Sequence, residues 1–213
     1  MTSDTATPAH QHAYDELKRA IMAGDYPPGT TFSIQSIADQ FDFGMMPVRE
    51  ALKRLSAEGA IEVSPKRAMR IPTLDKQSIA DVCRMRSILE GEAAARAADN
   101  MTAPIITHLK TLDAQMETAL DKGDGRQFRR SNQEFHFSIY NAADAYMMTP
   151  VIEMLWLQIG PLQANYTKEN YLIGRGVHAH IVAALERADA RLARAAMESD
   201  IASATDVFLK FFD

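Results

Sequence analysis

The chain has 213 residues, with 23 basic and 28 acidic side chains, so its formal net charge is −5. This length allows one large or two small domains, and a hydrophobic content of 46% supports a real core. The charge argues against a nonspecific nucleic-acid coat, and no apolar run approaches the roughly 18 residues of a membrane span. The start of the chain lacks a secretory signal pattern, and a single cysteine, Cys83, fits a reducing cytoplasm.

Residues 36–59 carry the clearest pattern, which is two short helices joined by a tight turn. We expect the first helix to begin at Ser36 and the turn to lie at Asp42–Gly44. In the second helix, Pro47 suits the first turn, where a missing N–H costs little, and Gly59 suits the end. Apolar residues recur between them at helical spacing and predict a buried stripe.

A short β-hairpin with a basic turn is expected next, with strands near 61–63 and 69–71. Residues 49–70 hold six basic and three acidic side chains, a local net charge of +3. This order of elements predicts a winged helix-turn-helix, which presents its second helix to the major groove of DNA. The expected DNA-contacting residues are Arg49, Met45, Lys53, Lys66 and Arg67.

The rest of the chain is helical almost without interruption. Helices are expected near residues 76–99, 103–122, 125–142, 146–168, 174–187 and 189–211. Six helices in this length predict a compact bundle. We therefore predict a mainly α protein, with an N-terminal winged helix-turn-helix domain at residues 10–72 and a C-terminal all-α bundle of six helices at residues 74–213.

Four segments, taken in order, resemble a known family. FGMMPVREALKRLSAEGAIEVSPKR resembles the DNA-binding domain of GntR-type transcriptional regulators. RMRSILEGEAAARAA, NQEFHFSIYNAA and HAHIVAALERADARLARAAM resemble the FCD effector domain of its FadR subfamily. The resemblance covers residues 12–211 and implies a cytoplasmic bacterial homodimer, most often a repressor, that binds a palindromic operator in double-stranded DNA. It also implies a small organic-acid effector in the helical domain, in many members together with a divalent metal.

The chain departs from the family where the second helix begins. Family members usually carry Ser-Arg-Thr there, and the arginine commonly contacts bases, whereas this chain has Gly44, Met45 and Met46. Arg49 remains available for a guanine edge or a phosphate, and Met45 for a thymine methyl group. Alternatively, the two methionines simply pack against the protein. We expect an operator unlike the family's commonest one.

The resemblance also implies a metal site, with Asn132, His136, His178 and Asp200 at the ligand positions. Asn132 replaces the usual aspartate, and Asp200 replaces the usual last histidine, so the set keeps a charge of −1. Two imidazoles with one or two oxygen ligands suit Zn²⁺, Ni²⁺ or Mn²⁺. The alternative is a polar pocket that binds an effector without a metal.

Arg86 and Tyr166 are the candidate effector-binding residues. A guanidinium can hold a carboxylate through two hydrogen bonds, but Arg86 also has Glu90 four residues later and can pair with it instead.

Two other functions stay open: a metal-dependent enzyme, which the absence of a motif-spaced nucleophile or base disfavours, and an acyl-CoA regulator without metal. We expect no enzymatic activity, and we expect the short linker near Pro72 to pass the effector signal to the DNA-binding domain.

Overall fold

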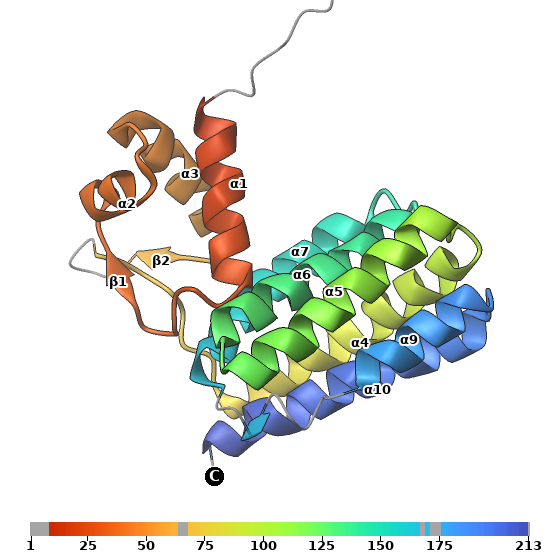
Figure 1. The fold of residues 1–213 in the computed structure, drawn as a ribbon. Helices are drawn as coiled ribbons and strands as arrows, with labels where there is room; N and C mark the ends of the chain where they lie inside the picture. The colour runs from red at the N-terminus through yellow and green to blue at the C-terminus, as the bar shows by residue number, and fades with distance from the viewer. Residues whose placement is uncertain (1–8, 64–67, 167–168, 171–175, 213) are drawn as a thin grey trace, which may run out of the picture.

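The computed structural model describes residues 9–63, 68–166, 169–170 and 176–212. A small winged helix-turn-helix unit at the N-terminus sits against one end of a bundle of long helices (Figure 1). The predicted mainly α fold with these two parts is confirmed.

The winged unit contains three helices and a three-stranded sheet, namely α1 (Ala9–Met22), β1 (Thr31–Phe32), α2 (Ile34–Phe41), α3 (Met45–Ala57), β2 (Glu62–Val63) and β3 (Met69–Arg70). The antiparallel sheet has the order β1-β3-β2, in which Arg70 pairs with both Thr31 and Glu62. The sequence analysis missed β1 because a two-residue strand gives no periodic signal. The return strand is also shorter than predicted, since it ends at Arg70.

The helix-turn-helix forms where it was predicted, with one correction at its start. Helix α2 begins at Ile34 after Ser33, whose side chain accepts from the Ser36 backbone N–H. The Ser36 hydroxyl in turn accepts from the Ser33 N–H, so the two serines form a reciprocal cap and the helix starts earlier than expected. Asp42 adopts the left-handed conformation that turns the chain into α3.

The bundle contains six α-helices within the described residues: α4 (Lys76–Ala98), α5 (Ala103–Lys122), α6 (Gly125–Ala142), α7 (Met148–Ile159), α9 (Val177–Glu186) and α10 (Ala190–Leu209). Short 3₁₀ segments, η1 (Gly160–Asn165) and η2 (Lys210–Phe212), follow α7 and α10. Helix α4 packs along α10 and also contacts α6, α7 and α9, so it is the central helix of the bundle.

The long helix expected at 146–168 is shorter in the structure. Helix α7 ends at Ile159, and the chain continues as η1 through Gly160 and Pro161. Pro161 has no N–H to continue the helical ladder. The last predicted residues of this helix, 167–168, lie outside the described residues, as do residues 174–175 at the start of the next one. Helix α9 is described from Val177, after Gly176 at φ 81°.

One hydrophobic core runs through the winged unit and the bundle. A second, smaller cluster joins α4, α7 and α10 and holds the thiol of Cys83. Burial raises the pKa of this thiol, so Cys83 is an inert core residue. Among the described residues, none of the helices is long and apolar enough to cross a membrane.

Candidate metal and effector site

The helix that a winged unit presents to DNA must be buried on one side and exposed on the other, and α3 has both sides. Its buried stripe consists of Val48, Ala51, Leu52 and Leu55. On the opposite side, Arg49 and Lys53 are exposed, and the described acidic residues form no ion pair with either.

The two methionines at the start of α3 do not pack into the core. Met45 is 54% exposed and Met46 is 64% exposed, at the end of the helix that a winged unit directs into the groove. Lys66 and Arg67, the other predicted contacts, lie outside the described residues.

The bundle contains a small, partly open cavity of about 60 Å³, lined by both polar and apolar side chains. All six residues that were candidates for metal or effector binding line it: Arg86, Asn132, His136, Tyr166, His178 and Asp200. They come from α4, α6, α9 and α10 and from the segment after η1, so the fold brings together residues that are more than one hundred positions apart. Their roles stay predictions, because the structure shows their positions only.

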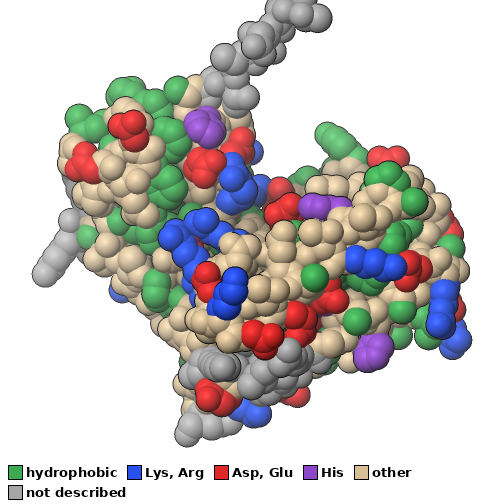
Figure 2. Space-filling view, viewed as in Figure 1, with side chains coloured by type: hydrophobic (Ala, Val, Ile, Leu, Met, Phe, Trp, Pro, Cys, Tyr) green, Lys and Arg blue, Asp and Glu red, His purple; other side chains and the backbone are tan. Residues whose placement is uncertain are grey.

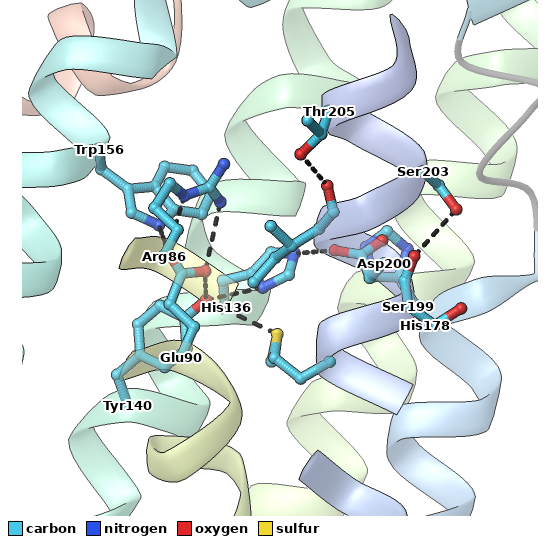
Figure 3. A network of polar contacts seen from close by, with 12 residues as sticks. Arg86, Glu90, His136, Tyr140, Trp156, His178, Ser199, Asp200, Ser203 and Thr205 are labelled. Atoms are coloured by element: carbon cyan, nitrogen blue, oxygen red, sulfur yellow. Dashed lines mark hydrogen bonds and ion pairs between the residues drawn. The ribbon is translucent and has the colours of Figure 1, made fainter. Parts of the chain in front are cut away.

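Three of these residues form a buried cluster that fits the donor set of a metal ion (Figure 3). His136 Nε2 lies 3.3 Å from Asp200 Oδ2, and His178 Nε2 lies 3.8 Å from Asp200 Oδ1. The potential ligand atoms all lie within 4.8 Å of one another. Bonds of about 2.0–2.1 Å to a tetrahedral ion imply ligand atoms about 3.4 Å apart, so small side-chain shifts would close the cluster around a cation.

A hydrogen-bond chain fixes the orientation of His136. Its Nδ1 lies 3.0 Å from the hydroxyl of Tyr140, and that hydroxyl donates its only proton to Glu90. The Tyr140 oxygen therefore accepts from Nδ1–H of His136, which leaves Nε2 as the nitrogen that faces Asp200. A histidine held in this way through its other nitrogen is the usual arrangement around a metal.

The protonation states also suit a cation. Burial lowers the pKa of His178 to about 4, so its imidazole is neutral at pH 7 and has a lone pair to offer. Burial acts to raise the pKa of Asp200, but its contact with His136 and the charges of nearby residues, Arg86 among them, outweigh burial and hold the pKa at about 2. The cluster thus presents an ionised carboxylate and a neutral imidazole in a buried place.

The buried Nε2 of His178 finds no hydrogen-bond partner among the residues that the structure describes. An unpaired polar atom in the interior costs roughly 1–3 kcal/mol, so it indicates a missing partner. A divalent cation would satisfy this nitrogen together with His136 Nε2 and Asp200, and a carboxylate with two imidazoles suits the metals predicted from the sequence. The residues therefore fit a metal, and Asn132 lies at the cavity wall with them.

Arg86 both pairs with Glu90 and lines the cavity, so the two readings of the sequence are compatible. Its Nε donates to Glu90 at 2.7 Å, its Nη2 donates at 3.2 Å, and the pair is buried. The guanidinium also stacks 4.8 Å from the centre of the Trp156 ring. Of its five N–H groups, three are not used by Glu90, which leaves donors for a carboxylate in the cavity.

The sequence analysis missed part of this site. Glu90 accepts hydrogen bonds from Arg86, from Tyr140 and, at 2.9 Å, from Trp156 Nε1. It is therefore the common acceptor of this hydrogen-bond network. Tyr140 follows His136 by four residues, and this spacing on one helix face was a signal for it. Gln163 and Asn170 also line the cavity, and nothing in their local sequence indicated it.

A winged helix-turn-helix joined to a helical bundle defines a DNA-binding transcription regulator. Residues 81–203 match the FCD domain and residues 9–71 match the bacterial regulatory proteins of the gntR family, so the chain belongs to the GntR regulators that carry an FCD domain. This family consists of regulators, which confirms that the chain is not an enzyme.

Named relatives and solved structures agree with this assignment. The HTH-type transcriptional regulator McbR of Escherichia coli K12 is 32% identical over 147 residues, which is 69% of this chain and 66% of the relative. A probable D-xylose utilization operon transcriptional repressor of Paenarthrobacter nicotinovorans is 28% identical over 93% of this chain and 88% of its own length. The structure of E. coli McbR/YncC has a TM-score of 0.90 at 24% identity and covers 98% of this chain and 100% of its own, so the fold is shared.

Proposed function

We propose that the protein is a ligand-responsive repressor that binds a palindromic operator as a homodimer and senses a small carboxylate through a metal in its bundle. The His136–His178–Asp200 cluster carries this proposal, because two buried histidines and a mostly buried aspartate line one cavity in a bundle that is joined to a DNA-binding unit. We divide the chain into a DNA-binding domain at 10–72 and an effector and dimerisation domain at 74–213. Chromosomal DNA as the target makes the cytoplasm the expected compartment.

The DNA-contacting set is Arg49, Met45 and Lys53 on α3, together with Lys66 and Arg67, which lie outside the described residues. Exposure and charge support the first three, since all point away from the core. Arg49 lies in the first turns of α3, within reach of a guanine edge or a phosphate, and a good bidentate contact contributes about 1–3 kcal/mol of discrimination. Met45 contacts a thymine methyl group in place of the missing family arginine.

The metal, Zn²⁺, Ni²⁺ or Mn²⁺, is held by His136, His178 and Asp200, with Asn132 as a weaker or water-mediated ligand. A divalent ion on a set with a charge of −1 leaves a local charge of +1, which attracts one carboxylate. Arg86 and Tyr166 then contact the effector from the cavity wall. When bound, the metal would supply a positive charge that attracts the carboxylate of the effector.

The size of the cavity separates this reading from the acyl-CoA alternative. A volume of about 60 Å³ holds an ion with a few waters or a very small acid. Drug-sized ligands occupy pockets of roughly 300–1,000 Å³, and an acyl chain needs an apolar lining. The small volume and the two buried histidines favour a small metal-bound anion. Repression is favoured because a relative is named as a repressor.

Two adjacent helices of the bundle support a homodimer. Helices α4 and α7 pack together, and each leaves apolar residues at helical spacing in solvent: Met85 and Ile88 on α4, Val151 and Met154 on α7. Exposed apolar side chains on neighbouring elements mark a protein interface. A second copy of the chain is the natural occupant, because a palindromic operator requires twofold symmetry.

The proposal is tested by incubating the purified protein with fragmented genomic DNA of its source and sequencing the retained fragments. We expect a few sharply enriched palindromic sites that disappear with Arg49→Ala. Arg96→Ala is the matched control, since it removes one exposed arginine from the bundle. Diffuse recovery that neither substitution changes would show that α3 does not read sequence.

The metal is tested in parallel through Trp156, the single tryptophan of the chain, whose ring lies 5.5 Å from that of His136. Titration of EDTA-treated protein with Zn²⁺ is expected to change its fluorescence with a stoichiometry of one ion per chain. The change should be absent after His178→Gln and present after His180→Gln, because His180 is exposed two residues away. Equal titrations in both variants would exclude this site.

A further inference from the structure

The end of α1 and the start of η1 meet backbone to backbone. A Cβ atom placed on Gly160 would lie 2.3 Å from the carbonyl oxygen of Met22, which is far closer than any real contact. A Cβ on Gly24 would lie 2.8 Å from the carbonyl oxygen of Gly160 and 3.1 Å from the backbone N of Ala164. The winged unit and the bundle therefore touch here without side chains between them.

Helix α6 holds the same end of α1. Arg129 Nε donates to the carbonyl oxygen of Ala23 at 2.9 Å, as a cation does at a helix C-terminus. The next residues along the chain include Asp25, whose mostly buried carboxylate accepts from Arg126 at 3.0 Å and from Arg130 at 3.1 Å. Figure 2 shows basic side chains gathered at this junction between the two parts.

We call this contact the seam, defined as residues 22–25 of the winged unit with Gly160–Ala164 and Arg129 of the bundle. Beside the seam, a cleft of about 960 Å³ separates the two parts, lined by α1 and α2 on one side and by α6 on the other. The winged unit also contacts α7, through the Lys18–Glu153 ion pair at 2.6 Å and through Gln158 Nε2, which donates to the carbonyl oxygen of Gly59 at 2.9 Å, but the seam is where backbone meets backbone with open space next to it. A small movement of the seam would change the orientation of the winged unit.

The two elements that hold the seam also form walls of the cavity. Gln163 lies within η1 and Tyr166 directly after it, and both line the cavity. On α6, the cavity side carries Phe128, Asn132 and His136 at spacings of four residues. Arg129, one residue after Phe128, turns to the seam. Each element therefore has one face on the cavity and another on the end of α1.

We propose that the seam transmits the state of the cavity to the winged unit, so that Gly24 and Gly160 are positioning residues for operator binding. This inference rests on the proposed function. It replaces the linker near Pro72 as the route, because the seam connects the cavity walls to α1 directly. Such coupling is reciprocal and typically amounts to about 5–150-fold in affinity.

The test measures hydrogen exchange at the seam of the full-length protein. The amides of Ala23, Gly24 and Asp25 bond to Arg19, Ile21 and Ala20, so their exchange reports whether the end of α1 is held. EDTA-treated protein is compared with protein saturated with Zn²⁺, and binding is read separately from Trp156 fluorescence. We expect Zn²⁺ to change exchange at these amides by at least about fivefold.

Gly24→Ala and Gly123→Ala form a matched pair. Both glycines follow a helix and have nearly the same φ, +67° and +70°, so the backbone strain is equal. Only the Cβ at position 24 meets other atoms, since nothing lies within 4 Å of that at 123. We expect Zn²⁺ to bind both variants but to change seam exchange only in Gly123→Ala. If Gly24→Ala does not fold, Asp25→Asn takes its place.

Each outcome decides the proposal. Bound Zn²⁺ without a change at the seam of the wild type would overturn it, and so would an undiminished change in Gly24→Ala. If Zn²⁺ does not bind the wild type, the metal part of the proposed function fails, and Tyr166→Ala tests the seam alone by opening the cavity wall. Exchange at residues 23–25 must then rise, and unchanged exchange would refute the coupling.

Discussion

Replacing Asp200 by asparagine gives the sharpest test of the metal site. Asp200 is the only carboxylate of the three-residue cluster, so the substitution changes the charge of the set from −1 to zero and keeps the shape. A ligand at a hundred times its dissociation constant stabilises the native state by about 2.7 kcal/mol. For a chain of this size, about 2–4 °C of melting temperature corresponds to each kcal/mol. Zn²⁺ should therefore raise the wild-type Tm by roughly 5–11 °C.

In Asp200→Asn we expect at least about a hundredfold weaker binding, which at the same Zn²⁺ concentration leaves a stabilisation of only about 0.4 kcal/mol. The expected shift is then about 1 °C. The metal-free variant should itself be less stable, because the lowered pKa of Asp200, about 2 against 3.8, corresponds to roughly 2 kcal/mol. The Zn²⁺-induced shift, and not the absolute Tm, is thus the quantity to compare.

Differential scanning calorimetry of EDTA-treated protein, with and without Zn²⁺, measures these shifts. Asp206→Asn is the control, because Asp206 lies on the same helix but is exposed and outside the cavity. It should retain the full wild-type shift. Equal shifts in Asp200→Asn and the wild type would show that Zn²⁺ stabilises the protein elsewhere and would refute the proposed ligand set.

Three further predictions concern other parts of the molecule. The pKa of His178 falls from 6.5 to about 4 on folding, so the unfolded state binds more protons than the native state between these pH values. The metal-free protein should therefore have its full stability above pH 6.5 and lose roughly 3 kcal/mol of it as the pH falls to 4. Urea unfolding measures this loss, which should be smaller in His178→Gln. Arg86→Ala leaves Glu90 buried without its positively charged partner and should lower the free energy of unfolding in urea by about 3–5 kcal/mol. The double substitution of Arg86→Met with Glu90→Gln removes both charges and should lower it clearly less. Equal losses in the two variants would argue against the ion pair. Replacing a contacted thymine of the operator by deoxyuridine removes one methyl group and should weaken wild-type binding roughly fourfold in an anisotropy titration, with little effect on Met45→Ser.

The winged helix-turn-helix was predictable because its signals are local. The stripe from Val48 to Leu55 repeats at helical spacing, and Gly59 and the turn at Asp42 stand where such elements end. Boundaries were less reliable where a cap or a distant contact decides them. Ser33 takes the cap in place of Ser36, and α7 ends at Ile159, just before Gly160, whose backbone lies against that of α1, and Pro161, which has no N–H.

The candidate site was predictable only in part, for a similar reason. The four-residue spacing of Asn132 and His136 places them on one helix face, and the family resemblance added His178 and Asp200. Which side chains meet across the bundle is not written in any local pattern. Glu90 therefore looked like a partner for Arg86 alone, whereas in the structure it also accepts from Tyr140 and Trp156.

The close approach of Gly24 and Gly160 has a consequence for protein engineering. A chimeric sensor that joins a foreign DNA-binding domain to this bundle must keep a glycine where Gly24 now lies, because a Cβ atom there would meet the backbone of Gly160. A donor with a side chain at that place would tilt on the bundle even if its own fold were intact. A chimera that exchanges the DNA-binding domain should therefore keep residues 20–25 of this chain together with the bundle. The new domain would then bind its own operator while its contact with the bundle stays unchanged.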